Sequence, residues 1–310
     1  MSDTHTDADS VGAAAARPKA GGRNFTAATA VGLLLYGGVV VLAWWLPQLL
    51  VVAVMVASVF AVKELRAAFD MQKLHLMRVP QFACSILMPA AAYVFGLPGL
   101  MIAFACGIAL VFAIRMFRGE EAFVRDVAAN IFVIAYLPML LSFVAMLLRP
   151  TGAEMDLGGS PLQWAALVDP LSLDAGHHGS LRLIVLLTLN VCADTAALFV
   201  GMAIGKHKLA PRVSPKKTWE GFIGSLVVAA AVGAWLLPAL LDYRWWAGLL
   251  MGLVCACVAA AGDLCESMIK RDLGVKDMSS LLPGHGGIMD RLDSIMPNAF
   301  AVWLMFAVVL

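Results

Sequence analysis

Charged residues are scarce in this chain of 310 residues, because Asp, Glu, Lys and Arg together make up only 14% of it. Hydrophobic residues make up 61%, and the mean hydropathy is +0.86. Soluble globular domains have about 25% charged residues, so this composition excludes that class. It predicts an integral membrane protein, in which each spanning helix needs about 20 apolar residues.

Three further absences narrow the function. The net charge of +1 shows no basic excess, which excludes nucleic acid as a partner. The six cysteines lack CxxC spacing, so we expect small buried hydrophobes rather than a zinc site or a redox pair. A Walker pattern is also missing, because GMAIGK at 201–206 has only three residues between its glycines.

Long apolar runs predict an all-α, polytopic membrane bundle of about nine transmembrane helices. The first run, 27–62, is too long for one helix and carries Trp44, Trp45 and Pro47 near its middle, which predicts a helical hairpin. The other spans are expected at about 81–96, 98–117, 127–148, 181–205, 222–241, 245–262 and 294–310. We expect 1–24 to be a disordered cytoplasmic tail, 25–180 an N-terminal transmembrane region, and 181–310 a catalytic transmembrane region with cytoplasmic loops at 206–221 and 263–293.

The distribution of positive charge predicts a cytoplasmic N-terminus. With nine spans and the N-terminus inside, all of the 22 Lys and Arg except Arg149, Arg182 and Arg244 fall in cytoplasmic segments. Short loops rich in Lys and Arg stay in the cytoplasm, so this asymmetry supports both the orientation and the number of spans. We expect a bacterial inner membrane, with the functional face toward the cytoplasm.

The segment 206–221, KHKLAPRVSPKKTWEG, combines five cations with a single carboxylate. Two interpretations remain open. A basic segment beside a membrane can anchor it to acidic lipid. Ser214, Lys216 and Lys217 are also suited to a polyphosphate, which needs several donors and positive charges held together.

The segment 263–293 carries six carboxylates, four Lys or Arg and one His in a chain that has few charges. A solvated loop could have this composition. However, Asp263 directly follows an apolar helix, and Asp290 and Asp293 are three residues apart, so these two share one helix face. Carboxylates from two helix ends are typical ligands of Mg²⁺ bound to substrate phosphates, and the glycines of PGHGG, with His285, allow a close approach to phosphate.

Asp194 lies deep within an apolar span. It is either a structural residue bonded to a neighbouring helix, or a residue that faces a polar cavity shared with the two loops. The helix continues from Asp194 to Lys206, about 18 Å at 1.5 Å per residue. That distance suits a cavity that extends into the cytoplasmic half of the membrane.

The segment Ser267–Asp293, SMIKRDLGVKDMSSLLPGHGGIMDRLD, resembles the signature of the phosphatidate cytidylyltransferases, also called CDP-diacylglycerol synthases. The matching positions are Ser267, Lys270, Arg271, Lys276, Asp277, His285, Gly286, Gly287, Asp290, Arg291 and Asp293. SPKKTWEG resembles the second motif of that family. The resemblance covers 190–300; before that, only a hydrophobic helical pattern is shared. It departs at CADTAALF, where a small polar sequence is expected, although Asp194 is retained.

The resemblance implies transfer of the cytidylyl group of CTP to phosphatidic acid, a membrane lipid, which gives CDP-diacylglycerol and pyrophosphate for phospholipid synthesis. It implies a Mg²⁺ cofactor held by Asp263 and Asp290, together with Asp293. Lys216, Lys217 and Ser214 would hold CTP phosphates, Lys270 and Arg271 the substrate or leaving phosphates, and His285, Gly286 and Gly287 phosphate or cytidine. Ser267, Lys276, Asp277, Arg291 and Asp194 complete the expected substrate-binding set. A homodimer is compatible with the sequence.

Two alternatives belong to other classes. A CTP-dependent lipid alcohol kinase would share the basic segment but use a hydroxyl to attack the γ-phosphorus, so it would need a positioned base. A membrane transporter would place charges along a pathway across the membrane, whereas here nearly all the unusual charges are expected on one face.

Overall fold

The computed structural model describes residues 25–72, 74, 76–117, 119–149, 177–275, 278–279 and 287–308. The chain divides into two compact units, Met1–Gly37 and Gly38–Leu310, and the elements that carry the site all belong to the second. The expected tail at 1–24 and residues 150–176 lie outside the described residues.

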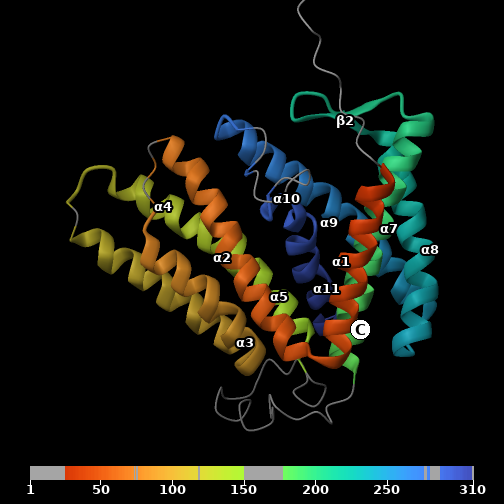
Figure 1. Ribbon diagram of the computed structural model, residues 1–310, viewed down its shortest axis with the longest axis horizontal. Coiled ribbons are helices and arrows are strands. Elements are labelled where there is room, and N and C mark those ends of the chain that lie inside the picture. The colour runs from red at the N-terminus through yellow and green to blue at the C-terminus, as the bar shows by residue number, and fades with distance from the viewer. Residues whose placement is uncertain are drawn as a thin grey trace, which may run out of the picture. The chain divides into compact units, whose positions relative to one another are not determined.

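Helices dominate the described part of the chain (Figure 1). In order they are α1 (Phe25–Trp45), α2 (Pro47–Met71), α3 (Arg78–Met116), α4 (Phe123–Ile134), the π-helix η1 (Ala135–Met139), α5 (Leu140–Leu147), α7 (His178–Ile204), α8 (Trp219–Leu241), α9 (Trp245–Asp272), α10 (Met289–Leu292) and α11 (Ile295–Val308). Among the described residues, six helices are long and apolar enough to cross a membrane, with α4, η1 and α5 forming one of them. This confirms an all-α polytopic membrane protein, whereas the count of nine spans and the regional boundary at 180 stay predictions.

The first apolar run is broken where its aromatic and proline residues predict. α1 ends at Trp45 and α2 begins at Pro47, and Leu46 between them has a non-helical backbone with φ −142° and ψ 60°. Proline is tolerated in the first turn of a helix, because the N–H that it lacks would have no acceptor within the helix there. The expected helix break is therefore confirmed.

α3 is bent into two helical halves rather than being one straight span. Gly96, with φ 67° and ψ −148°, separates the halves in a conformation that residues with a Cβ rarely adopt. Cys84 of the first half lies against Gly107 of the second, where an added Cβ would overlap the Cys84 sulfur. The predicted spans 81–96 and 98–117 therefore correspond to these two halves.

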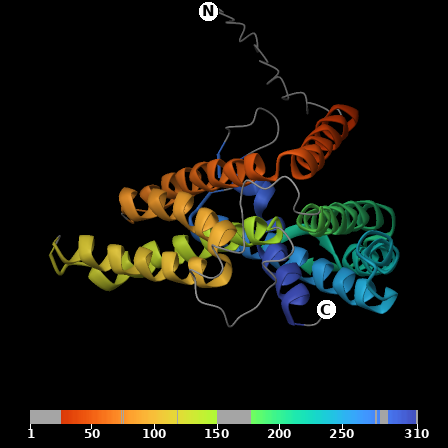
Figure 2. The same ribbon diagram turned by 90° about the horizontal axis from the view of Figure 1, so that it is seen from below.

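α7, α8 and α9 lie side by side (Figures 1 and 2) and pack closely because glycines lie at their crossings. A Cβ added at Gly221 of α8 would lie 2.6 Å from the carbonyl oxygen of Ala197 in α7. One added at Gly233 of α8 would overlap the backbone of Gly248 in α9. Small residues let helix backbones approach closely in a membrane, where lipid tails provide no hydrophobic drive between helices. This packing fixes the three helices that carry most of the site.

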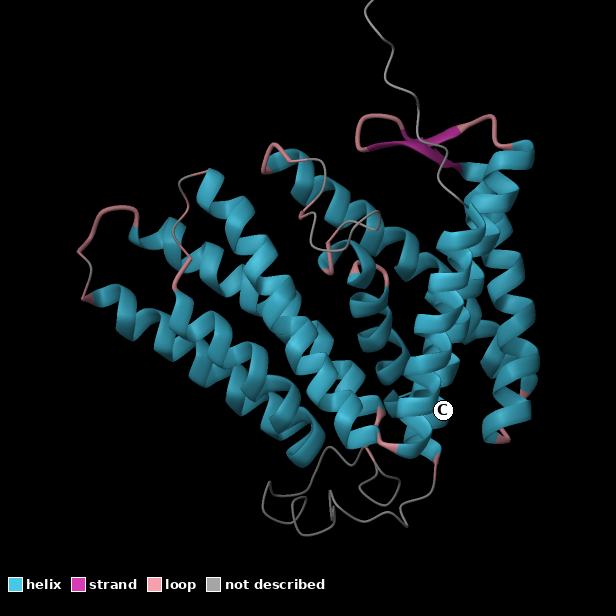
Figure 3. Ribbon diagram, in the orientation of Figure 1, coloured by secondary structure: helices cyan, strands magenta, loops and turns pink. Residues whose placement is uncertain are grey.

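A two-stranded antiparallel sheet connects α7 to α8 at one end of the bundle (Figure 3). β1 (Lys208–Ala210) pairs with β2 (Ser214–Thr218). The expected loop 206–221 is therefore wrong in part, since it is a hairpin followed by the first turn of α8. Thr218 caps that helix by accepting a hydrogen bond from the backbone N–H of Gly221 at 3.2 Å.

The second expected loop, 263–293, starts later than predicted. α9 continues to Asp272, so residues 263–272 are helical. The prediction ended the helix where its apolar run ended, but Leu, Glu, Met, Lys and Arg in DLCESMIKRD all favour a helix. Gly274, with φ 71°, follows the end of the helix in the left-handed conformation that is common there.

Candidate active site

A cavity of about 690 Å³ lies between α7, α8, α9, the β hairpin and the segment that precedes α11. Six of the residues predicted from the sequence line it: Asp194, Lys216, Lys217, Asp263, Asp290 and Asp293. Leu198, Met202 and Phe222 contribute an apolar wall. The fold thus brings cations, carboxylates and apolar side chains from distant parts of the chain to one cavity.

The hairpin carries two lysines to this cavity. Lys216 and Lys217 lie on β2, which leads directly into α8. The Lys217 ammonium lies 2.6 Å from Oδ2 of Asp263 on α9 and donates to the carbonyl oxygen of Ala260 at 3.5 Å. Lys216 is exposed, and Ser214, at the start of the strand, is not among the residues that line the cavity.

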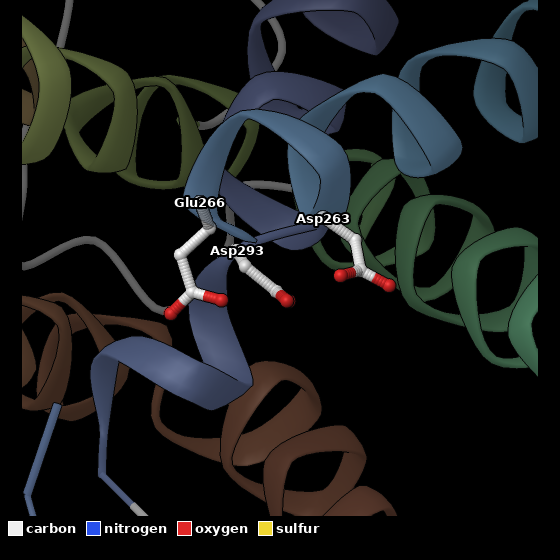
Figure 4. Close-up of side chains that lie close together, drawn as sticks. All are labelled: Asp263, Glu266 and Asp293. Atoms are coloured by element: carbon white, nitrogen blue, oxygen red, sulfur yellow. The ribbon is translucent and has the colours of Figure 1, made fainter. Parts of the chain in front are cut away.

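Three carboxylate side chains of the site lie close together (Figure 4). Oxygen atoms of Asp263, Glu266 and Asp293 all lie within 4.8 Å of one another. Asp263 and Glu266 are three residues apart on α9 and therefore share one face of the helix, while Asp293 directly follows α10. Glu266 is not among the predicted site residues, because the apolar run that predicts the helix ends at 262; in the longer helix, its spacing of three residues from Asp263 is the signal.

The charge and the oxygen donors of this carboxylate group suit a cation, and two of its members already pair with lysines, Asp263 with Lys217 and Glu266 with Lys270. Burial, and next the charge of Asp263, raises the pKa of Asp293 to about 6. Glu266 is almost fully buried, with 1% of its side chain exposed. Ionised carboxylates this close together destabilise one another, and Mg²⁺ prefers oxygen ligands of this kind. The donor set therefore fits a divalent cation.

Asp290 lies next to this group, where Lys270 holds it. The Lys270 ammonium lies 2.6 Å from Oδ1 of Asp290 and 2.7 Å from Oε2 of Glu266, so it bridges the two carboxylates. Oδ2 of Asp290 accepts a hydrogen bond from the backbone N–H of Gly287 at 2.8 Å. Burial alone would raise the pKa of Asp290, but Lys270 and the Gly287 N–H outweigh it and hold the pKa below its ordinary value. A metal-binding role for Asp290 stays a prediction.

Asp194 lines the cavity and is also hydrogen-bonded to neighbouring residues. It therefore combines the two expected roles, that of a residue facing a polar cavity and that of a structural residue bonded to its neighbours. Asn190, one turn earlier on α7, donates to Oδ2 of Asp194 at 3.3 Å, and the Ser294 hydroxyl donates to the same oxygen at 3.4 Å. Asn298 of α11 donates to Oδ1 of Asn190 at 2.6 Å, and both asparagines are buried. None of these partners is among the residues predicted for the site. The spacing of four residues between Asn190 and Asp194 could have indicated the first contact.

The other predicted residues lie around the cavity or beyond the described residues. The Ser267 hydroxyl donates to Oδ1 of Asp263 at 3.4 Å, and Gly287 is buried against Glu64 of α2. Arg271 and Arg291 are exposed and are not among the residues that line the cavity. Lys276, Asp277, His285 and Gly286 lie outside the described residues, so their expected roles stay predictions.

Comparison with known proteins gives an independent assignment. A profile of the cytidylyltransferase family matches residues 26–309. A phosphatidate cytidylyltransferase of Mycobacterium leprae (strain TN) is 32% identical over 309 residues, which cover 93% of this chain and 89% of that protein. A phosphatidate cytidylyltransferase of Haemophilus influenzae (strain ATCC 51907 / DSM 11121 / KW20 / Rd) is 43% identical over 124 residues, covering 38% of this chain and 43% of that protein. The chain therefore belongs to the cytidylyltransferase family.

Proposed function

We propose that this protein is a phosphatidate cytidylyltransferase, which transfers the cytidylyl group of CTP to phosphatidic acid and releases pyrophosphate. The observation that carries the proposal is the lining of one cavity by Lys216 and Lys217, by Asp263 and Asp293, and by apolar side chains of α7 and α8. Such a site suits two polyanions, one of which also has acyl chains. The names of the relatives support the same activity.

The reaction needs charge neutralisation more than it needs a base. A phosphate oxygen of phosphatidic acid attacks the α-phosphorus of CTP, a new P–O bond forms, and the bond to the β-phosphate breaks, so that pyrophosphate leaves. A phosphate monoester has a second pKa of about 6, so the nucleophile is already an anion at neutral pH. The cost of the step lies in bringing two anions together and aligning them.

Lys216 and Lys217 are assigned to the CTP phosphates. Both line the cavity, and the pairing of β2 with β1 fixes their backbone. Lys217 already lies opposite a carboxylate oxygen of Asp263, which is the kind of acceptor that a phosphate oxygen also provides. Lys270 has a different assignment from that in the sequence analysis, because its ammonium is held between Glu266 and Asp290; it orders the carboxylates.

Asp263, Glu266 and Asp293 are the residues that would hold Mg²⁺. Their converging oxygens and the high pKa of Asp293 support this assignment. Bound there, Mg²⁺ would supply positive charge next to the triphosphate. Asp290 would act through Lys270, whose ammonium also holds Glu266 in place.

The cavity is proposed to open toward the cytoplasm of a bacterial cell, where CTP is available. Lys206, Lys208, Arg212, Lys216 and Lys217 all lie in the segment that joins α7 to α8. Positive charge concentrated at one end of a helical membrane bundle indicates the cytoplasmic side. The orientation and the inner membrane are therefore parts of the proposal.

The decisive experiment follows the label of radioactive CTP into lipid. The purified protein is incubated in mixed micelles with CTP labelled at either the α- or the γ-phosphorus, and with phosphatidic acid or, in a parallel sample, diacylglycerol. Transfer of the α-label to lipid and of the γ-label to pyrophosphate is expected. A lipid alcohol kinase would transfer the γ-label to a diacylglycerol acceptor instead, and a transporter would transfer neither label. Either result would contradict the proposal, and the Asp290→Asn variant, expected to lose most of its activity, controls for contaminating enzyme.

A further inference from the structure

Glu64 is a buried carboxylate of α2, in the part of the chain where the sequence analysis found only a hydrophobic pattern. Only 4% of the surface of Glu64 is exposed. It lies far along the chain from the residues of the cavity, and it is not among those that line it. A buried carboxylate is destabilising unless its oxygens accept hydrogen bonds, so its partners indicate why it is there.

The groups that donate hydrogen bonds to Glu64 belong to the segment that ends at the carboxylates of the site. Its Oε1 accepts hydrogen bonds from the Ser279 hydroxyl at 2.5 Å and from the backbone N–H of Ile288 at 3.0 Å. Its Oε2 accepts from the backbone N–H of Met289 at 3.0 Å. One side chain of α2 therefore binds two consecutive backbone N–H groups directly before Asp290.

A glycine next to these amides lets the carboxylate come this close. A Cβ added at Gly287 would lie 2.6 Å from Oε2 of Glu64, which is closer than real Cβ contacts allow. Gly287 also donates its own N–H to Asp290 at 2.8 Å. Three consecutive backbone N–H groups, at 287, 288 and 289, are thus each bound by a carboxylate.

Hydrogen bonds and ion pairs connect this backbone to Glu266 of the carboxylate group. Asp290 binds Lys270, Lys270 binds Glu266, and Glu266 lies with Asp263 and Asp293 in the carboxylate group. Residues at the end of α2 contact the start of the same segment as well, because the Gln72 amide donates to the carbonyl oxygen of Leu273 at 2.9 Å. α2 therefore contacts the backbone both at Leu273 and directly before Asp290.

We propose that Glu64 is a positioning residue for the transferase reaction: it fixes the backbone at Ile288 and Met289 and thereby aims Asp290 and Asp293 at the cavity. It touches neither substrate nor metal in this role. The inference rests on the proposed function for its catalytic consequence, but the contacts themselves can be tested without turnover.

The test combines amide hydrogen exchange with kinetics on the full-length protein in mixed micelles. Glu64→Gln keeps the size of the side chain but replaces one acceptor oxygen by an NH₂ group, so one of the two backbone N–H groups loses its acceptor. Exchange at residues 288–289 is expected to become about ten- to a hundredfold faster, the factor that corresponds to one lost hydrogen bond to a charged group. The kcat is expected to fall by about tenfold or more, since small misplacements of reacting groups have effects of that size.

The KM for CTP should change little, because the lysines assigned to CTP lie on the hairpin and not on this segment. Asp70→Asn is the matched control, since it makes the same chemical change at an exposed position of the same helix; neither its kcat nor the exchange at 288–289 should change. Gly287→Ala disrupts the contact from the other side and should also accelerate exchange at 288–289; its exchange alone is compared with that of Glu64→Gln, because Gly287 is also in the predicted substrate-binding set. If Glu64→Gln does not fold, the Gly287→Ala result decides.

Two results would overturn the inference. Unchanged exchange at 288–289 would mean that Glu64 does not hold these amides, and faster exchange with an unchanged kcat would mean that their position does not matter for turnover. A wrong proposed function gives a different result. The unmodified protein is then inactive with CTP and phosphatidic acid, while exchange at these two amides is still faster in Glu64→Gln.

Discussion

The Lys217 ammonium lies 2.6 Å from Oδ2 of Asp263, an ion pair that joins the β hairpin to the carboxylate group on α9. Their side chains are 23% and 41% exposed, so water screens part of the attraction. The pair links the two halves of the site, one basic and one acidic, which the sequence carries 46 positions apart. A lysine has a flexible stem, so we expect its ammonium to move from Asp263 to a CTP phosphate oxygen.

Removing either hairpin lysine should weaken CTP binding. Lys216→Gln or Lys217→Gln removes one charge-assisted contact worth about 1.5 to 3 kcal/mol. The loss should appear mainly as a higher KM for CTP, because the triphosphate is charged in the ground state as well as in the transition state. The KM for phosphatidic acid should change much less, and both constants can be measured in mixed micelles at a fixed lipid fraction.

Arg212→Gln provides the control for the lysine variants. Arg212 lies in the turn of the same hairpin, is exposed, and is not among the residues that line the cavity. Its removal takes away the same charge and should leave the KM for CTP unchanged. The lysines do not bind the CTP phosphates if Lys216→Gln and Lys217→Gln leave the KM for CTP unchanged, as Arg212→Gln should. If these two variants alter only the dependence of activity on acidic lipid, the hairpin is a membrane anchor.

Neutralising a carboxylate of the converging group should raise the requirement for Mg²⁺. An amide has nearly the volume of a carboxylate but is a poorer ligand, so Asp263→Asn and Asp293→Asn should increase the Mg²⁺ concentration for half-maximal activity by about tenfold or more. Removal of divalent cations by a chelator should abolish turnover of the unmodified protein. Titration of Mg²⁺ into each purified variant measures the shift.

Asp272→Asn is the comparison for that experiment, since Asp272 is the exposed last residue of α9. Its Mg²⁺ requirement should equal that of the unmodified protein. If activity depends on the Mg²⁺ concentration in the same way for Asp293→Asn and Asp272→Asn, Asp293 is not a ligand of the cation.

Asp290 and Lys270 can be distinguished by how their substitutions combine. If Asp290 acts by holding Lys270, then Asp290→Asn, Lys270→Gln and the double variant should all lose activity to a similar degree, because each breaks the same ion pair. If Asp290 is a metal ligand, as the sequence predicts, Asp290→Asn should shift the Mg²⁺ requirement by more than Lys270→Gln does. We expect Asp290→Asn to keep less than about a tenth of the activity in either case, since charge-assisted contacts of this kind are worth about 1.5 to 3 kcal/mol.

Much of this architecture could be predicted from local patterns. Trp45 and Pro47 indicated the first helix break, and the gap between two apolar spans coincides with Gly96. The lysines of β2 and the carboxylates near 263 and 290 could be identified as one site because they are unusual in so apolar a chain. Charge pattern and turn residues can be identified from short stretches of sequence. They are informative in a membrane protein because charges and helix breaks are costly within the spanning helices.

The parts that could not be predicted depend on contacts between distant segments. Glu266 was hidden by a helix end placed ten residues too early, because polarity was taken as the boundary. Glu64 had no local signal at all, since its partners Ile288 and Met289 lie more than 200 positions away and offer only backbone groups. Spacing within a helix can indicate neighbours one turn apart, but it cannot indicate which helix will pack against which loop.

The buried amides next to Asp194 should contribute to stability. Asn298→Leu leaves Oδ1 of Asn190 without its donor in a buried position, which should cost about 1 to 3 kcal/mol. Thermal unfolding in detergent micelles should show a lower midpoint. Leu304→Met serves as the control, because it keeps the side-chain volume at an exposed position of the same helix and should leave the midpoint unchanged. An unchanged midpoint for Asn298→Leu as well would mean that the amide pair contributes nothing measurable.

The orientation of the bundle can be tested by thiol labelling on either side of α7. The six native cysteines are all free, so a cysteine-free background is first made, and Ser214→Cys and Ser172→Cys are then introduced separately. Because Lys and Arg concentrate around 206–217, a membrane-impermeant maleimide added to inverted vesicles should label Ser214→Cys and not Ser172→Cys. Spheroplasts should give the opposite pattern, and labelling after solubilisation confirms that both thiols are present. Reversed labelling would invert the orientation, and labelling of both positions from one side would mean that α7 does not cross the membrane.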